Sequence, residues 1–570
     1  MSPMALRQHR IQVAGHRQVA LGRSRQRLMI GLLLFAGLVV LLALRLLDLA
    51  LLSGDRDHDR ADPFAALVPP RADILDRNGV ELARTFEAYA VAVRPQEISG
   101  DKRLLARRIA AALPGVSEER AYAQLMSNGK FRYLSRRVLP SDAKKLLALG
   151  EPAIVLEREP ERLYPNLDLA AHVIGYTDID GKGKAGMERA FDERLSRPDL
   201  RGQPLQLSID SRVQMALESE LAAAMVKFSA IGAAGVVMDV HTGEIIAMTS
   251  LPELNPNDAG SGSMEARFNR ATLGVYELGS TFKAFTVAMG LDAGVIRSMD
   301  QLWDCTTNLK IGRFSISDTH PLKRMATVPE IIKESSNIGT ARIAHELGAA
   351  RQQEFLRKLG FMEPVSIELK ERGRTLTPGA NWGEIATMTV GYGHGIAVTP
   401  LHLATGYAAI ANGGVWRPAT LLKVGKNHPV APGRRVFTEE TSYKMRALLR
   451  LVVEDGTGGK ANAPGYRVGG KTGTAEKAKG GGYARKDLVT NFAGVFPMDD
   501  PKYVVVAMLD EPRATKDTYG FSTAGWNVAP VVGKVVARIA PALGVAPSET
   551  KDADWQSLMQ YVHEPKKHGE

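Results

Sequence analysis

The feature that most constrains this chain is an uncharged apolar run near its N-terminus. No residue from Leu28 to Leu44 carries a charge, and six arginines precede the run without any acidic residue. Seventeen helical residues cover about 25 Å, and the apolar residues up to Leu52 extend that length toward the roughly 30 Å hydrocarbon core of a membrane. The sequence therefore predicts a basic tail at residues 1–27 and a transmembrane anchor at residues 28–52.

The charge flanking this run predicts its orientation. Arginine-rich flanks stay in the cytoplasm, which sends everything after Leu52 across the membrane. A cleaved signal peptide is the alternative, but the run exceeds the usual length of about 7–15 residues and no convincing small-x-small cleavage site follows. Residues 54–60 are mostly charged and predict a linker. We therefore expect a retained single-pass protein.

Composition limits the classes of protein and site. At 570 residues, with 45% hydrophobic and 24% charged residues, the chain can form more than one globular domain. The single cysteine, Cys305, excludes an intrachain disulfide and a cysteine-rich zinc site. Part of the net charge of +11 lies in the basic tail, so we do not expect nucleic-acid binding. His320, His394 and His402 are scattered and are expected to be structural, which predicts no metal site.

Two domains are expected after the linker. Residues 53–210 alternate short strands, turns and short helices, including a hairpin-type Asn78-Gly79 turn, and predict a non-catalytic pedestal. Residues 211–545 predict an α/β domain that opens with a helix at 213–228. Strands at 235–239 and 244–248 should follow this helix. The polar tail at residues 546–570 is expected to be mobile.

The strongest chemical signal is Ser280 followed by Lys283 in an apolar stretch. If a helix begins at Gly279, the two side chains lie one turn apart on one face. A serine hydroxyl attacks well only when a base takes its proton, and a neutral lysine can be that base. Apolar neighbours such as Phe282 and Phe285 would lower the pKa of the lysine by desolvation. The helix N-terminus would also present backbone N–H groups to a developing oxyanion.

Two downstream segments support this interpretation. Ser335 and Asn337 stand two residues apart before a predicted helix, where a hydroxyl and an amide can project into one cleft. Residues 469–476 predict a glycine-rich strand whose edge a substrate could join as an added strand. On that strand, Lys471 would place a positive charge near Lys283 and favour the neutral form of the latter. A lone Ser-x-x-Lys is common, but the two further segments strengthen the prediction that Ser280 and Lys283 are catalytic.

Residues 465–472 also match the phosphate-binding pattern G-x-x-x-x-G-K-[ST]. That motif requires a strand before it and a helix directly after its last residue. Here Pro464 precedes the pattern, and Gly473 and the glycines at 480–482 follow it. These surroundings argue against nucleotide binding.

The ordered trio of Ser-x-x-Lys, Ser-x-Asn and Lys-Thr-Gly resembles the motifs of penicillin-binding proteins and serine β-lactamases. The whole chain resembles a class B penicillin-binding protein, most closely the division-specific type called penicillin-binding protein 3. The sequence departs from this family at Ala72, where glycine is usual, and at Leu278, where proline often stands. Both positions neighbour motif residues and leave the catalytic groups intact.

The resemblance implies a fold and an activity. It implies an α/β (α+β) transpeptidase domain with a central antiparallel sheet flanked by helices, after an elongated α+β pedestal and one transmembrane helix. The implied activity is a peptidoglycan D,D-transpeptidase that cross-links stem peptides at the division septum through an acyl-serine formed on D-Ala-D-Ala. No cofactor is called for. The implied site residues are the nucleophile Ser280, the base Lys283, the further catalytic groups Ser335, Asn337 and Lys471, and the substrate-binding Thr472, Gly473 and Thr474.

The resemblance also implies partners and a location. The catalytic domain would lie in the periplasm, anchored in the bacterial inner membrane, and β-lactams would acylate Ser280. A membrane-embedded glycan polymerase and other division proteins would contact the anchor and pedestal. The alternatives are an elongation-type transpeptidase, a β-lactamase or penicillin sensor, and a non-catalytic scaffold. A β-lactamase would need a base for its deacylating water, and none is evident.

Overall fold

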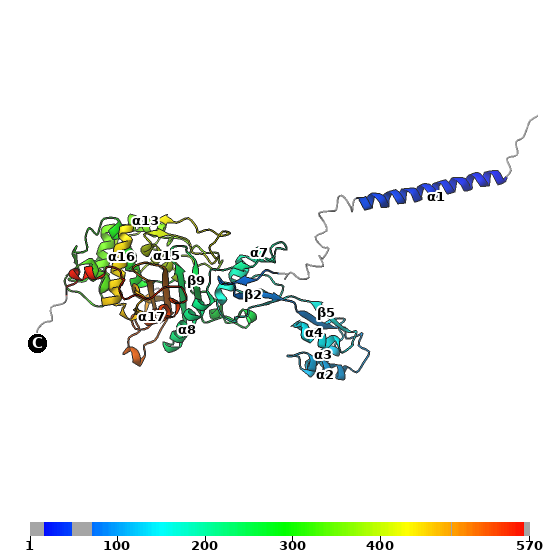
Figure 1. Ribbon diagram of the computed structural model, residues 1–570, viewed down its shortest axis with the longest axis horizontal. Helices are drawn as coiled ribbons and strands as arrows, with labels where there is room; N and C mark the ends of the chain where they lie inside the picture. The colour runs from blue at the N-terminus through cyan, green and yellow to red at the C-terminus, as the bar shows by residue number, and fades with distance from the viewer. Residues whose placement is uncertain (1–15, 48–70, 480–481, 564–570) are drawn as a thin grey trace, which may run out of the picture. The chain divides into compact units, whose positions relative to one another are not determined.

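The computed structural model describes residues 16–47, 71–479 and 482–563 (Figure 1). The chain divides into two compact units, Met1–Val68 and Pro69–Glu570. The predicted charged linker at residues 54–60 lies outside the described residues, as do the ends of both predicted tails.

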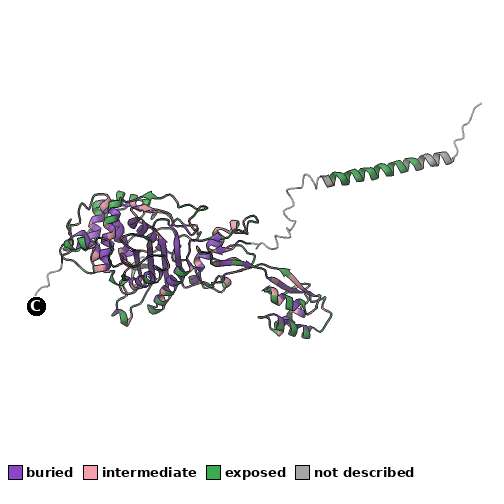
Figure 2. Cartoon of the chain, viewed as in Figure 1, coloured by how far each residue is buried: buried purple, intermediate pink, exposed green. Residues whose placement is uncertain are grey.

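The described part of the first unit is one helix, α1 (His16–Leu47). Its Arg27–Leu44 segment has a mean hydropathy of 2.6, and none of it is buried (Figure 2). By length and composition this helix can cross a membrane, which is consistent with the predicted single anchor.

The second unit begins with two small sheets. The Asn78-Gly79 turn joins two antiparallel strands as predicted, with Gly79 at a φ of +90°. The first sheet has the order β6-β2-β1-β7 and is formed by β1 (Ile74–Leu75), β2 (Glu81–Phe86), β6 (Glu161–Leu163) and β7 (Leu205–Gln206). The second sheet has the order β4-β3-β5 and is formed by β3 (Tyr89–Val93), β4 (Arg132–Val138) and β5 (Ile154–Arg158). Nearby helices are α2 (Lys102–Ala112), α3 (Glu118–Leu125), α4 (Pro140–Leu147), α5 (Ala171–Ile174), α6 (Gly186–Ala190) and α7 (Asp192–Ser196).

A buried carboxylate connects the segments around the first sheet. Glu188 on α6 is fully buried, and its Oε2 lies 2.6 Å from Nε of Arg71. Its Oε1 lies 2.7 Å from Nε of Arg162, while the Tyr164 hydroxyl donates to the same oxygen at 3.4 Å. Both guanidinium groups are almost completely buried, and Glu188 compensates their charge together with Asp192, whose Oδ1 lies 2.7 Å from Nη1 of Arg71.

A five-stranded antiparallel sheet forms the centre of the rest of the chain. Its order is β16-β17-β18-β8-β9, and its members are β8 (Gly232–Asp239), β9 (Ile245–Leu251), β16 (Gly469–Lys479), β17 (Gly482–Phe496) and β18 (Tyr503–Asp510). Helix α8 (Ser211–Lys227) precedes β8, so the predicted order of one helix and two strands is confirmed. The sheet flanked by helices has the predicted fold class.

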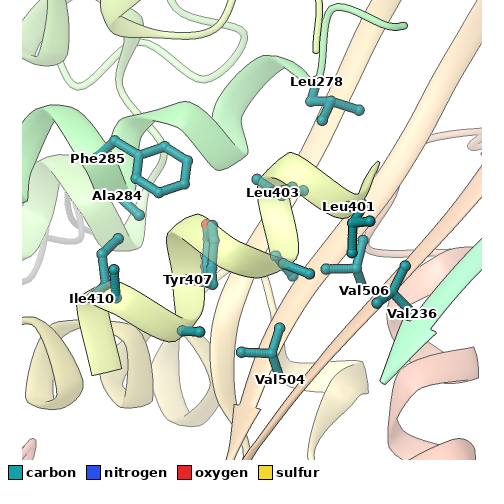
Figure 3. Packing of buried hydrophobic residues seen from close by; sticks show 14 of the residues in the cluster. Val236, Leu278, Ala284, Phe285, Leu401, Leu403, Tyr407, Ile410, Val504 and Val506 are labelled. Atoms are coloured by element: carbon teal, nitrogen blue, oxygen red, sulfur yellow. The ribbon is translucent and has the colours of Figure 1, made fainter. Parts of the chain in front are cut away.

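Alternating side chains on the strands separate two cores. On β8, Ala233 and Val237 pack on the side covered by α8 and α17 (Val528–Ile539). The side chain of Val236 points to the opposite face of the sheet, where it packs in the core that contains α15 (Pro400–Ala411). Figure 3 shows α15 between β18 and Phe285, with Tyr407 at its centre. Period-two alternation therefore lets each strand contribute to both cores.

Helices and short ladders surround the second core and carry the loops described below. The longer helices are α10 (Lys283–Asp292), α12 (Asn337–Leu347), α13 (Ala349–Lys358), α14 (Glu384–Gly391) and α16 (Glu439–Asp455). The shorter ones are α9 (Met264–Arg267) and α11 (Val328–Lys333). The two-stranded ladders pair β10 (Trp303–Asp304) with β13 (Met325–Ala326), β11 (Leu309–Ile311) with β12 (Phe314–Ile316), and β14 (Val415–Trp416) with β15 (Arg434–Arg435).

The expectation of a mobile C-terminal tail is wrong as far as residue 563. Leu558 is 6% exposed and belongs to the larger core. The carboxylate of Asp552 accepts from Nε of Arg450 at 2.9 Å. The backbone N–H of His563 donates to Glu330 on α11 at 2.6 Å. Composition indicated mobility because it does not reveal one buried leucine and a few specific polar contacts.

A second buried carboxylate lies where the pedestal meets α8. Glu218 on α8 is 8% exposed, and its Oε1 accepts the backbone N–H of Ala170 at 2.9 Å and Nε2 of Gln214 at 2.8 Å. Burial raises the pKa of Glu218 to about 7. The nearby Glu253, hydrogen-bonded to Asp168, has its pKa raised to about 8, chiefly by burial.

We expect Glu218→Gln to stabilise the full chain in detergent at pH 8. The unfolded carboxyl loses its proton near its ordinary pKa of about 4.5, whereas the folded one keeps it to about 7, so the wild type loses stability as pH rises between those values. Glutamine removes a buried charge worth about 1–3 kcal/mol at pH 8 and almost nothing at pH 4. Thermal unfolding at both values measures this, with the exposed Glu119→Gln as control. An equal gain at pH 4 would contradict the explanation.

Candidate active site

The candidate nucleophile Ser280 lies in a tight turn against β16. Residues Gly279–Phe282 form one 3₁₀ turn, and the α-helix begins at Lys283 instead of at Gly279 as we expected. Gly279 has a φ of +58°, and a Cβ there would come within 2.7 Å of the Thr474 carbonyl oxygen. Only glycine fits this approach, which brings the backbone of Ser280 next to that of Thr474.

Aromatic packing holds the helix that follows the turn. The rings of Phe282 and Phe285 lie 5.5 Å apart, and both contact Phe361. The Tyr407 hydroxyl donates to the carbonyl oxygen of Thr281 at 2.9 Å. These contacts leave the N-terminus of α10 little freedom.

Lys283 is fully buried, as its apolar surroundings predicted. Its Nζ donates to the Ser335 carbonyl oxygen at 2.5 Å and to Ser335 Oγ at 3.0 Å. Burial lowers the pKa of Lys283 well below its ordinary value, and the positive charge of Lys471 lowers it further. A lysine in this state can accept a proton near neutral pH.

Ser335 connects the two lysines. Its Oγ also accepts from Nζ of Lys471 at 3.0 Å, so one hydroxyl bridges two buried amines. Ser335 has a φ of +63°, a conformation that a non-glycine residue adopts only when its surroundings hold it. Lys471 is fully buried on β16, and burial lowers its pKa to about 7. A proton can therefore pass between the amines through this hydroxyl.

Asn337 begins α12 two residues beyond Ser335. Its Nδ2 donates to the Ser317 carbonyl oxygen at 2.9 Å, and its side chain lines the same cavity as Ser280. Sequence spacing predicted that Ser335 and Asn337 would share a cleft, and they do.

β16 is an edge strand that pairs only with β17 among the described strands, so its outer edge is open to an added strand. A Cβ at Gly473 would come within 2.3 Å of the Leu278 carbonyl oxygen, which explains the glycine. The Thr472 hydroxyl donates to that of Thr457 at 3.2 Å, and Oγ of Thr474 accepts the N–H of Ala524 at 3.0 Å.

A phosphate-binding loop is ruled out at Thr472. That motif needs a helix directly after its last residue, whereas here the strand continues to Lys479.

A cavity of about 640 Å³ joins these groups. Lys283 and Lys471 lie beneath its wall, and the Ser280 hydroxyl makes no hydrogen bond to any residue in the described ranges. Predicted site residues on the wall are Ser280, Ser335, Asn337, Thr472 and Thr474.

Sequence reasoning missed three groups on this wall. Thr457 follows α16 and contacts Thr472. Asp318 holds the loop that carries Ser335. His394, which we expected to be structural, lines the cavity with its Nδ1 3.3 Å from Oε2 of Glu277. The signal for Thr457 was its place beside the glycines at 456 and 458, whereas nothing local distinguished Asp318.

Comparison with known families follows the same two regions. A model of the penicillin-binding protein transpeptidase domain matches residues 233–532, and a model of the penicillin-binding protein dimerisation domain matches residues 66–202. The chain belongs to the class B penicillin-binding proteins. The resemblance inferred from the three motifs is thereby confirmed.

Relatives of this class B penicillin-binding protein match most of its length. It is 42% identical over 486 residues to "Probable peptidoglycan D,D-transpeptidase FtsI" of Caulobacter vibrioides, covering 83% of this chain and 82% of the relative. It is 31% identical over 518 residues to peptidoglycan D,D-transpeptidase FtsI of Escherichia coli, covering 85% of both. The solved structure of penicillin-binding protein 3 from Mycobacterium tuberculosis complexed with ampicillin has a TM-score of 0.67 and 25% identity, covering 85% of this chain and 97% of that one.

Proposed function

We propose that this penicillin-binding protein is a septal peptidoglycan D,D-transpeptidase that works through an acyl-serine on Ser280. The observation that carries the proposal is the Ser335 hydroxyl, which bridges two buried lysines beside the nucleophile turn. In this arrangement Lys283 can take the proton of the Ser280 hydroxyl, and Lys471 can then supply a proton to the leaving group. The relatives named as FtsI support the septal role over an elongation role.

The acylation step begins at the penultimate D-alanine of a stem peptide. Ser280 Oγ attacks the carbonyl carbon of the D-Ala-D-Ala bond, and Lys283 takes the hydroxyl proton. The backbone N–H groups of Ser280 and Thr474 stabilise the oxyanion, because the Gly279 turn places these two backbones side by side. The C–N bond then breaks, and the leaving amine of D-alanine receives a proton through Ser335 from Lys471.

Substrate binding uses the open edge of β16. The stem peptide pairs with the strand from Gly473 to Thr474, and the hydroxyls of Thr472 and Thr474 bind the terminal carboxylate. Asn337 donates to an amide of the acyl-enzyme. The amine of a second stem peptide attacks the acyl carbon, which forms the cross-link and releases Ser280. A β-lactam has an activated amide and a carboxylate in equivalent places, so it acylates Ser280 as a substrate mimic.

This role assigns a location to each part of the chain. The basic tail at residues 1–27 lies in the cytoplasm, and residues 28–52 cross the inner membrane. Residues 53–210 form the pedestal, and the transpeptidase domain at residues 211–545 works in the periplasm, where its substrate is found. A membrane-embedded glycan polymerase and other division proteins contact the anchor and pedestal.

Intact-mass analysis of the full chain in detergent, incubated with a labelled penicillin, tests the proposal. We expect a stable one-to-one adduct with the wild type and complete loss of that adduct in Ser280→Ala. The exposed Ser298→Ala, just beyond the same helix, serves as the matched control and should form the adduct normally. Rapid drug turnover without an adduct would instead indicate a β-lactamase, and absence of any reaction would indicate a scaffold.

A further inference from the structure

The turn that carries Ser335 needs support from outside itself. Ser335 has a positive φ, yet its hydroxyl and carbonyl oxygen must stay within hydrogen-bond distance of two lysines on different elements. Its neighbour Ser336 is 1% exposed and is the N-cap of α12, accepting the N–H of Gly339 at 3.0 Å. A group that fixes Ser336 and the first residues of α12 therefore fixes Ser335 as well.

Asp318 is that group. Its Oδ2 accepts the Ser336 hydroxyl at 2.8 Å, and its Oδ1 accepts the backbone N–H groups of Asn337 at 2.5 Å and Ile338 at 3.0 Å. Asp318 is 8% exposed and follows β12, so it joins the loop to a segment far from it in sequence. The carboxylate satisfies two N–H groups that the helix itself leaves without acceptors.

The carboxylate also acts on Lys283 through its charge. Among the described residues, Lys471 lowers the pKa of Lys283 and Asp318 raises it, while burial is the largest influence. Cys305, which packs on Ser336, stays a neutral thiol because burial raises its pKa to about 11. The other titratable groups on the cavity wall are His320, Glu334, Tyr392, His394 and Glu476.

We infer that Asp318 is a positioning residue for acylation, which holds the Ser335 turn in place and supplies a negative charge close to Lys283. Its hydrogen bonds go to Ser336, Asn337 and Ile338 and not to Ser280, Ser335 or either lysine within the described residues. It acts through Ser336 and α12 on Ser335, and through space on Lys283. The inference rests on the proposed function, because it requires Lys283 to be the base for Ser280.

The pH dependence of acylation separates these two actions. In Asp318→Asn the amide oxygen can still accept both N–H groups, and the amide nitrogen can donate to the Ser336 hydroxyl, so the turn keeps its contacts and loses the charge. Without the carboxylate, Lys283 loses its proton more readily. We therefore expect the acidic limb of the acylation rate to move to lower pH by about 0.5–1 unit, with the plateau rate within about threefold of wild type.

The control is Asp210→Asn. Asp210 is also a buried N-cap aspartate, accepting the N–H of Arg212 at the start of α8, and it lies outside the cavity wall. We expect it to leave the acidic limb in place. A limb that stays in place in Asp318→Asn, or that moves equally in Asp210→Asn, overturns the inference.

Asp318→Ala tests the positioning action. It removes both acceptor oxygens and with them all three hydrogen bonds, and we expect acylation by a labelled penicillin to fall at least about tenfold across the whole pH range. A folded alanine variant that is acylated at the wild-type rate overturns this part. If the wild type itself is not acylated, the proposed function fails first, whereas an acylated wild type with unmoved variants contradicts only the role of Asp318.

Discussion

Replacing Lys283 with arginine is expected to slow acylation of Ser280 by about 10²–10⁴-fold, the range that general-base catalysis contributes. Arginine has a similar length and keeps a positive charge, but its guanidinium does not release its proton at any ordinary pH. It therefore cannot take the Ser280 hydroxyl proton, although it can still donate to Ser335. Stopped-flow or quenched measurement of labelled-penicillin attachment to the full chain in detergent gives the rate.

Burial makes this substitution informative. Lys283 is completely enclosed, and its lowered pKa depends on that enclosure and on Lys471. The partly exposed Lys444→Arg on α16, where the lysine pairs with Glu440, is the control and should acylate normally. If Lys283→Arg folds and reacts within tenfold of the wild-type rate, another group removes the proton and the assignment of the base is wrong.

Glu188→Gln is expected to lower the free energy of unfolding by about 3–5 kcal/mol, the cost of removing one partner from a buried ion pair. The substitution preserves volume, removes the charge and turns one acceptor oxygen into an N–H₂ donor, so cavity formation does not contribute. Arg71 and Arg162 would remain almost fully buried, one of them facing an amide N–H₂ group. Thermal or denaturant unfolding of the full chain in detergent measures the loss.

An exposed ion pair provides the comparison for this loss. Arg197 and Asp199 have side chains that are 54% and 61% exposed, so water solvates both charges with or without the pair. We expect Asp199→Asn to change the free energy of unfolding by less than about 0.5 kcal/mol. Equal effects of Glu188→Gln and Asp199→Asn would mean that the buried carboxylate is not what holds the pedestal segments together.

The sequence predicted groups that neighbour one another along the chain or repeat regularly. The strand at β8 and the glycine-rich strand at β16 are both found, whereas Ser280 lies in a 3₁₀ turn and only Lys283 lies in the predicted α-helix. Asp318 was missed because its partners lie 18–20 residues away in a loop that has no periodic pattern. Local rules describe a helix or a strand, whereas tertiary contacts decide which distant carboxylate fixes a turn.

The α-helix expected from Gly279 shows a different reason for error. Helix propensity does not distinguish a 3₁₀ turn from the first turn of an α-helix. Here the close approach of Gly279 to Thr474 accompanies the 3₁₀ turn. The packing of residues 546–563 against the transpeptidase domain (the docked segment) was missed because the polar composition of these residues suggested exposure. Buried residues in this segment, such as Leu558, are too few to produce a periodic hydrophobic pattern in the sequence.

The docked segment has a practical meaning for anyone who shortens this protein. Glu330 lies one turn before the Ser335 loop, and it binds the N–H of His563, while the Thr327 hydroxyl donates to the carbonyl oxygen of Tyr561 at 2.8 Å. The three motifs and the central sheet are already complete at residue 545. A truncation there would nevertheless remove these two hydrogen bonds and expose the N-terminal end of α11. A faithful soluble version, or a fusion joined to the C-terminus, has to keep the chain through His563.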